Sequence, residues 1–172
     1  MTNELQIFLI SVSRQTFVDA ARVHIGVRCE SVGLCVGFIL LTLRDVGLLP
    51  PDTDIKQSHL SEVNKLPRLW HFLLKNANEV PFKGEVAKDE LPDLRPGDLL
   101  LSRWLDENAE QNEIHHINIW TGWNDSPFGQ QMQCLLPEHG GTGTVQEVPL
   151  NSLDWRRIER VYRLHVLVGG EA

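Results

Sequence analysis

The chain has 172 residues, a formal net charge of -7 and a pI near 5.4, with 42% hydrophobic and 23% charged residues. This length and composition are typical of one globular domain, so we expect a single domain over residues 1–172, with residues 1–12 as an N-terminal arm. The acidic balance argues against nucleic acid as a partner, and no apolar run approaches the roughly 18 residues of a membrane span.

Apolar residues recur at helical spacing through the first half of the chain. Gly26 and Gly47 stop two of these patterns, because glycine is the usual residue just beyond a helix. The predicted helices run from Ser13, as the N-cap, to about Ile25, from about Leu34 to Val46, and from Leu66 to Asn76.

From Asp98 onward the pattern changes to short strands separated by turn residues. The predicted strands are Leu99–Trp104, His115–Thr121, Gln130–Leu136, Val145–Leu150 and Ile158–Val166. Helices come first and strands follow, without alternation between them. This order predicts an α+β domain with an antiparallel sheet.

Cys35 is the strongest candidate for chemistry in the helical half. The predicted helix over Leu34–Val46 places its thiol in the first turn, where free N–H groups and the helix dipole favour a thiolate, the form that acts as a nucleophile. A second interpretation stays open, because free cysteine is also among the most buried residue types and can simply pack there.

A cysteine nucleophile needs a base within hydrogen-bond reach, and the candidates are His115 and His116 at the start of a predicted strand. Alternation along a strand puts His116, Asn118 and Trp120 on one face and His115 on the other. The periodicity does not indicate which face meets the helix that carries Cys35.

Four blocks of sequence, in order across residues 16–165, together resemble the NlpC family of papain-like cell-wall cysteine peptidases, in particular its phage-tail branch. The first block surrounds Cys35. The four blocks are Ala20-Ala-Arg22 with Ile25-Gly26, Gly33-Leu-Cys-Val-Gly37 and Asp45-Val-Gly-Leu-Leu-Pro50; Leu94-Arg-Pro-Gly-Asp-Leu-Leu-Leu101; His116-Ile-Asn-Ile-Trp-Thr-Gly122; and Val145-Gln-Glu-Val-Pro-Leu150 with Trp155-Arg-Arg-Ile158.

The resemblance implies a papain-like fold in which Cys35, at a helix start, packs on the antiparallel sheet. It implies Cys35 as nucleophile, His116 as base and a third polar residue on the next strand, for which Gln133 is our choice, with Gln131 and His139 as alternatives. The implied reaction is hydrolysis of an amide bond in the peptide stem of peptidoglycan. The backbone N–H of Cys35 would hold the oxyanion of that reaction.

The sequence leaves three functions open, and the first is a peptidase carried by a phage tail tip to open the cell wall during DNA entry. Residues 1–10 lack the basic start and long apolar core of a signal peptide. We therefore expect synthesis in the bacterial cytoplasm without a signal peptide and assembly into a virion tail, with peptidoglycan and tail-tip or hub proteins as partners. Leu34 and Val36 replace the aspartate and small residue that usually flank the family's cysteine, so the alternative is a catalytically degenerate structural subunit of a tail tip. A hydrolase or transferase inside the cell, on the same fold, also stays open.

No cofactor and no metal are expected. The three cysteines cannot form a closed disulfide set, which favours folding in a reducing compartment. A metal site would have to combine Cys29, Cys35 and Cys134 with the His115-His116 pair. Such a site is disfavoured, because the chain has no Cys-x-x-Cys pair and adjacent histidines on a strand point to opposite faces.

Overall fold

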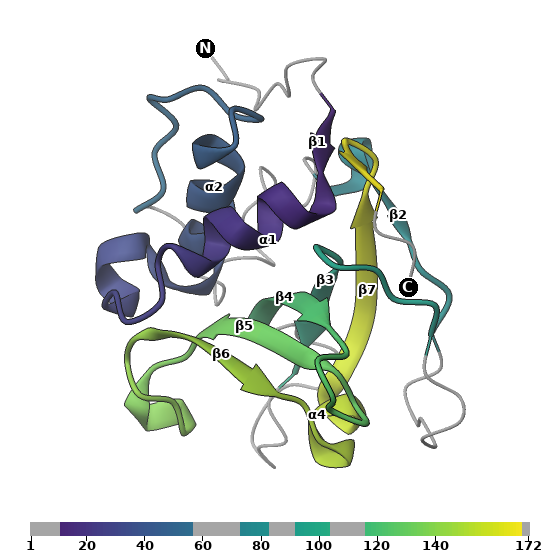
Figure 1. The fold of residues 1–172 in the computed structure, drawn as a ribbon. Helices are drawn as coiled ribbons and strands as arrows, with labels where there is room; N and C mark the ends of the chain where they lie inside the picture. The colour runs from purple at the N-terminus through teal and green to yellow at the C-terminus, as the bar shows by residue number, and fades with distance from the viewer. Residues whose placement is uncertain (1–10, 57–72, 83–91, 104–115, 170–172) are drawn as a thin grey trace.

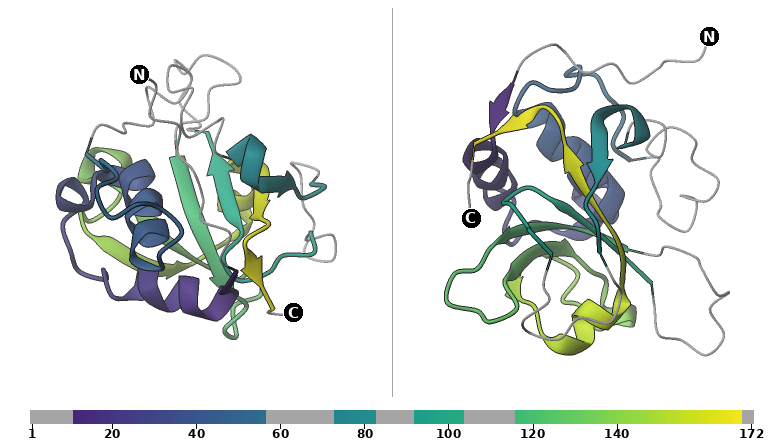
Figure 2. Two further views of the ribbon diagram at one scale, coloured as in Figure 1. Left: turned by 90° about the horizontal axis from the view of Figure 1, so that it is seen from above. Right: turned by 90° about the vertical axis from the view of Figure 1, so that its right-hand side faces the viewer.

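A six-stranded antiparallel sheet separates two layers of packing in the computed structural model, which describes residues 11–56, 73–82, 92–103 and 116–169 (Figure 1). Helices α1 (Arg14–Arg22) and α2 (Leu34–Asp45) cover one face. The short helix α4 (Ser152–Arg157) lies against the other face, as the side view in Figure 2 shows. The predicted α+β class with an antiparallel sheet is confirmed.

The two N-terminal helices begin close to where the sequence predicts. The side chain of Ser13 caps α1 by accepting a hydrogen bond from the N–H of Thr16 at 3.0 Å. The helix ends at Arg22 rather than near Ile25, and turns lead into a 3-10 helix, η1 (Cys29–Val32). Of the helix predicted over residues 66–76, only residues 73–76 are described, and these are helical.

Glycines at the start of α2 let the following chain pass close to the helix. A Cβ atom at Gly33 would lie 2.2 Å from the carbonyl oxygen of Ile55, and one at Gly37 would lie 2.4 Å from the same atom. Gly33 also has φ of 79°, which glycine adopts without strain. Both positions therefore require glycine in this packing.

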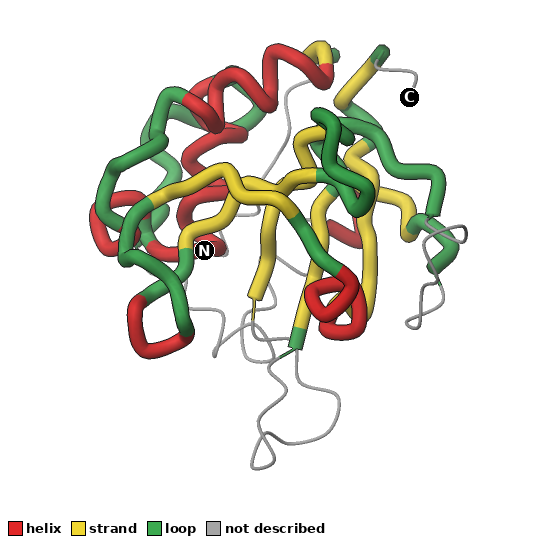
Figure 3. The backbone as a smooth tube through the Cα atoms, turned by 60° about the horizontal axis from the view of Figure 1, so that its bottom comes forward, coloured by secondary structure: helices red, strands yellow, loops and turns green. Residues whose placement is uncertain are grey.

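Strand order in the main sheet is β2-β7-β3-β4-β5-β6, and every neighbouring pair is antiparallel. Strands are yellow and helices red along the backbone in Figure 3. A separate two-stranded sheet pairs β1 with β8 in parallel. The sequence predicts five of these strands to within about two residues, and it misses β1, β2, β8 and α4. The strands are β1 (Val12–Ser13), β2 (Ala77–Glu79), β3 (Leu99–Ser102), β4 (His116–Gly122), β5 (Gln130–Cys134), β6 (Val145–Pro149), β7 (Ile158–Leu164) and β8 (Leu167–Val168).

Each face of the sheet packs against its own hydrophobic core. Leu101, Ile117 and Met132 contribute to the core beneath α1 and α2. The opposite core contains Leu100 of β3 and Trp155 of α4, together with Trp120, Leu150 and Val161. Because side chains alternate along a strand, this division fixes which β4 residues face α2.

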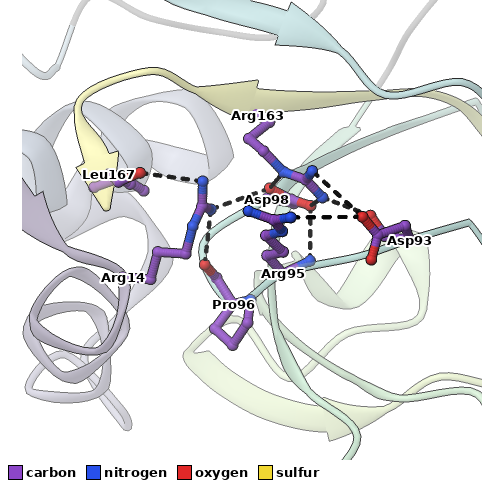
Figure 4. A network of polar contacts seen from close by, with 7 residues as sticks. All are labelled: Arg14, Asp93, Arg95, Pro96, Asp98, Arg163 and Leu167. Atoms are coloured by element: carbon purple, nitrogen blue, oxygen red, sulfur yellow. Dashed lines mark hydrogen bonds and ion pairs between the residues drawn. The ribbon is translucent and has the colours of Figure 1, made fainter. Parts of the chain in front are cut away.

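The turn before β3 is held by a buried ionic network (Figure 4). Asp98 has no exposed surface, and its carboxylate accepts hydrogen bonds from Arg163 at 2.8 and 3.0 Å and from Arg14 at 3.3 Å. The backbone N–H of Arg95 donates a further bond at 2.9 Å. The network joins α1, the turn and β7, so the motif Arg95-Pro-Gly-Asp98 has a structural role.

Candidate functional site

Cys35 lies in the first turn of α2 and faces the sheet. Its side chain is only 7% exposed and belongs to the core shared with Ile117 of β4. Burial raises the pKa of the thiol to about 11, although hydrogen bonds from the backbone N–H groups of Ile117, Val36 and Cys35 itself act to lower it. Desolvation therefore outweighs the favourable electrostatics of the helix start.

His116 begins β4 and is directly opposite Ser102 of β3 in the register of the two strands. The residue is 5% exposed and lines a cavity on the side of the second core. Burial, together with a smaller effect of nearby His139, lowers the pKa of His116 to about 4. The imidazole is therefore neutral near pH 7.

The structure does not bring Cys35 and His116 together, contrary to the pairing that the sequence predicts. Ile117 packs on the face that meets Cys35, so its neighbour His116 points to the opposite face. The alternation itself is as predicted, with His116 and Asn118 lining the same cavity. The other candidate base, His115, lies outside the described residues.

The candidates for the third catalytic residue lie on the same side of the sheet as His116 and not on the side of Cys35. Gln131 and Gln133 of β5 line the same cavity as His116. Gln131 accepts a hydrogen bond from the Asn118 side chain at 2.7 Å and donates one to Gln133 at 3.4 Å. His139 lies in η4 (Pro137–His139), near enough to affect the pKa of His116.

The sequence interpretation missed Asn118 as a site residue. It is 4% exposed and forms the inner end of the amide chain that continues through Gln131 to Gln133. The available signal was its position two residues after His116 on the same strand face. A polar amide on the same strand face as a candidate base indicates a further site residue, because such a group needs a hydrogen-bond partner when it is buried.

All three cysteines contribute to the core under α2. Burial raises the pKa of the Cys29 and Cys134 thiols. Within the described ranges, no group of three or more histidine, cysteine or acidic side chains is arranged to hold a metal ion.

The cavity beside His116 has a volume of about 60 Å³ and a mostly polar lining. Arg103 and Arg157 bring positive charge to it, and Asp154 brings negative charge. Arg103 is paired with Glu159 at 2.7 Å. The arrangement suits polar recognition, and its thiol-free lining does not offer a cysteine nucleophile.

Comparisons with known proteins do not assign the chain to a family. No protein-family model matches the chain, and no curated protein matches it either. In the parts of the chain that the structure describes, no helix has the length and apolar character needed to cross a membrane.

The depressed pKa of His116 predicts a pH-dependent stability. The pKa of a histidine is near 6.5 in the unfolded chain and that of His116 is about 4 in the folded protein. The contribution of the neutral imidazole to the free energy of unfolding is therefore complete above pH 6.5 and is lost as the pH falls toward 4. The full loss is about 3 kcal/mol, from the shift and 1.36 kcal/mol per pKa unit. Urea unfolding at several pH values should show this fall in the free energy of unfolding, and the fall should be smaller in His116→Gln. Parallel pH profiles in the two proteins would contradict the prediction.

Proposed function

We propose that the chain is a catalytically degenerate papain-like domain of the NlpC type that serves as a structural subunit of a phage tail tip. The observation that carries the loss of catalysis is the position of Cys35, which is buried, has a raised pKa and faces away from His116. The helix that starts beside Cys35 and packs on an antiparallel sheet supports the papain-like scaffold. The sequence blocks support the tail-tip assignment.

The geometry supports this function better than a cysteine peptidase. A peptidase would need a reactive thiolate, whereas a thiol with a pKa of about 11 is ionised only to about one part in ten thousand at pH 7. His116 and Gln133, the other predicted members of the catalytic group, lie across the sheet from the sulfur. Their shared cavity is available for binding instead.

Purified peptidoglycan is the direct test of lost turnover. The wild-type protein and Cys35→Ala should release no more soluble stem-peptide fragments or new amino groups than a protein-free blank. Cys134→Ala is a matched control, because it also removes a buried thiol from the same core. Release by the wild type and Cys134→Ala that is abolished in Cys35→Ala would contradict the proposal and restore the peptidase.

The structural role has its own readout in a phage that carries this gene. Cys35→Ala should leave the yield and infectivity of the particles close to those of the wild type, whereas deletion of the gene should stop the formation of complete tails. Normal tails without the protein would contradict the structural role.

A further inference from the structure

The cavity beside His116 lies across the sheet from Cys35, so an inference about it does not depend on whether the thiol reacts. Its floor consists of three side-chain amides from two adjacent strands: Asn118 of β4, and Gln131 and Gln133 of β5. Asn118 and Gln131 are 4% and 7% exposed. Buried polar groups of this kind are costly unless each finds a partner.

The amide chain leaves one strong acceptor unused. Asn118 donates through its Nδ2 to Gln131 at 2.7 Å, and Gln131 donates in turn to Gln133. The Oδ1 atom of Asn118 is buried, and nothing in the described part of the chain donates a hydrogen bond to it. A ligand group with an N–H or O–H donor would satisfy this oxygen.

A cationic donor on another element completes the cavity. Arg157, at the end of α4, lines it, and its buried Nε lacks a hydrogen-bond acceptor among the described residues. Arg103 is already paired with Glu159 at 2.7 Å, and Asp154 accepts a hydrogen bond from the backbone N–H of Asn151 at 2.8 Å. Arg157 is therefore the cation available to an anionic ligand.

We propose that this cavity binds an amino-acid-type group, in which a carboxylate pairs with the Arg157 guanidinium and an adjacent N–H donates to Oδ1 of Asn118. A guanidinium is well matched to a carboxylate, because it presents N–H donors in a fixed plane. At about 60 Å³, the cavity can hold the polar end of such a group. Asp154 at the same wall disfavours a doubly charged anion such as phosphate.

Four small probes separate the two halves of this recognition. N-acetylalanine carries both the carboxylate and the N–H, its methyl ester lacks the carboxylate, propionate lacks the N–H, and inorganic phosphate offers charge alone. Binding to the full chain is measured by titration, followed through the side-chain amide signals of Asn118 and Gln131 in NMR spectra, with the Gln131 signal serving in Asn118→Leu. N-acetylalanine should bind saturably, and each other probe should bind at least about tenfold more weakly, as expected from the loss of one charged or buried hydrogen bond.

Two substitutions on neighbouring positions of α4 provide the matched pair. Arg157→Gln should weaken N-acetylalanine binding about tenfold or more, whereas Arg156→Gln, at an exposed position outside the cavity lining, should leave it unchanged. Asn118→Leu should remove the advantage of N-acetylalanine over propionate. Equal effects of the two arginine substitutions, equal binding of N-acetylalanine and propionate, tighter binding of phosphate, or no saturable binding of any probe would each overturn the proposal.

Discussion

Replacing Asp98 by alanine should destabilise the fold by about 3–5 kcal/mol, a large part of the 5–15 kcal/mol typical of a whole domain. The carboxylate has no exposed surface and accepts hydrogen bonds from Arg14 and Arg163 (Figure 4). Its removal leaves Arg14, which is 3% exposed, as a buried cation without that counter-charge. Urea unfolding followed by circular dichroism measures the change.

Asp93 offers the matched control for this substitution. It also lies near Arg163, at 3.8 Å, but its side chain is 70% exposed. Asp93→Ala should cost less than about 1 kcal/mol, because exposed ion pairs contribute little. If Asp98→Ala is no more costly than Asp93→Ala, the buried network does not stabilise the fold as described.

A double substitution separates two effects of Asp98→Ala: the loss of the carboxylate's own hydrogen bonds, and the cost of leaving Arg14 as a buried cation. With Arg14 replaced by methionine, the additional cost of Asp98→Ala should be smaller than in the wild type, because one uncompensated cation is then absent. An equal cost in both backgrounds would assign the effect to Arg163 and to the backbone N–H of Arg95 instead.

The α+β class could be predicted from the sequence because the signals that begin and end helices and strands are local. The serine cap of α1, the glycine after α2 and the turn residues between strands act within a few residues of the chain. The capping box of α4, in which Asn151 and Asp154 bond reciprocally, was also present in the sequence. It was missed because the helix is only six residues long and follows directly on a strand signal.

The site could not be assembled from the sequence because its geometry depends on which faces meet. Alternation showed that His115 and His116 point to opposite sides, but each side carries a histidine beside apolar residues and both sides of β4 are buried, so the pattern did not identify the side directed away from α2. Helix α2 presents the same difficulty. Its residues Cys35–Leu43 are all buried, and no polar stripe indicated whether Cys35 was accessible.

The proposed loss of catalysis depends on an unreactive Cys35 thiol, and the rate of its alkylation by iodoacetamide against pH measures this directly. Cys29 and Cys134 are replaced by serine, and folding is checked before the assay. A pKa of about 11 in place of 9.0 reduces the thiolate fraction near neutral pH about a hundredfold. The higher nucleophilicity of a more basic thiolate offsets about tenfold of this, and burial slows the reaction further.

We therefore expect alkylation at pH 7 to be at least about tenfold slower than that of an ordinary exposed thiol, and to rise with pH toward 11. The same profile should appear in His116→Gln, because His116 faces the other side of the sheet. Fast alkylation well below pH 8 that is lost in His116→Gln would contradict the proposed loss of catalysis. Fast alkylation lost only in His115→Gln would also contradict it, and would identify His115 as the base of an active thiol.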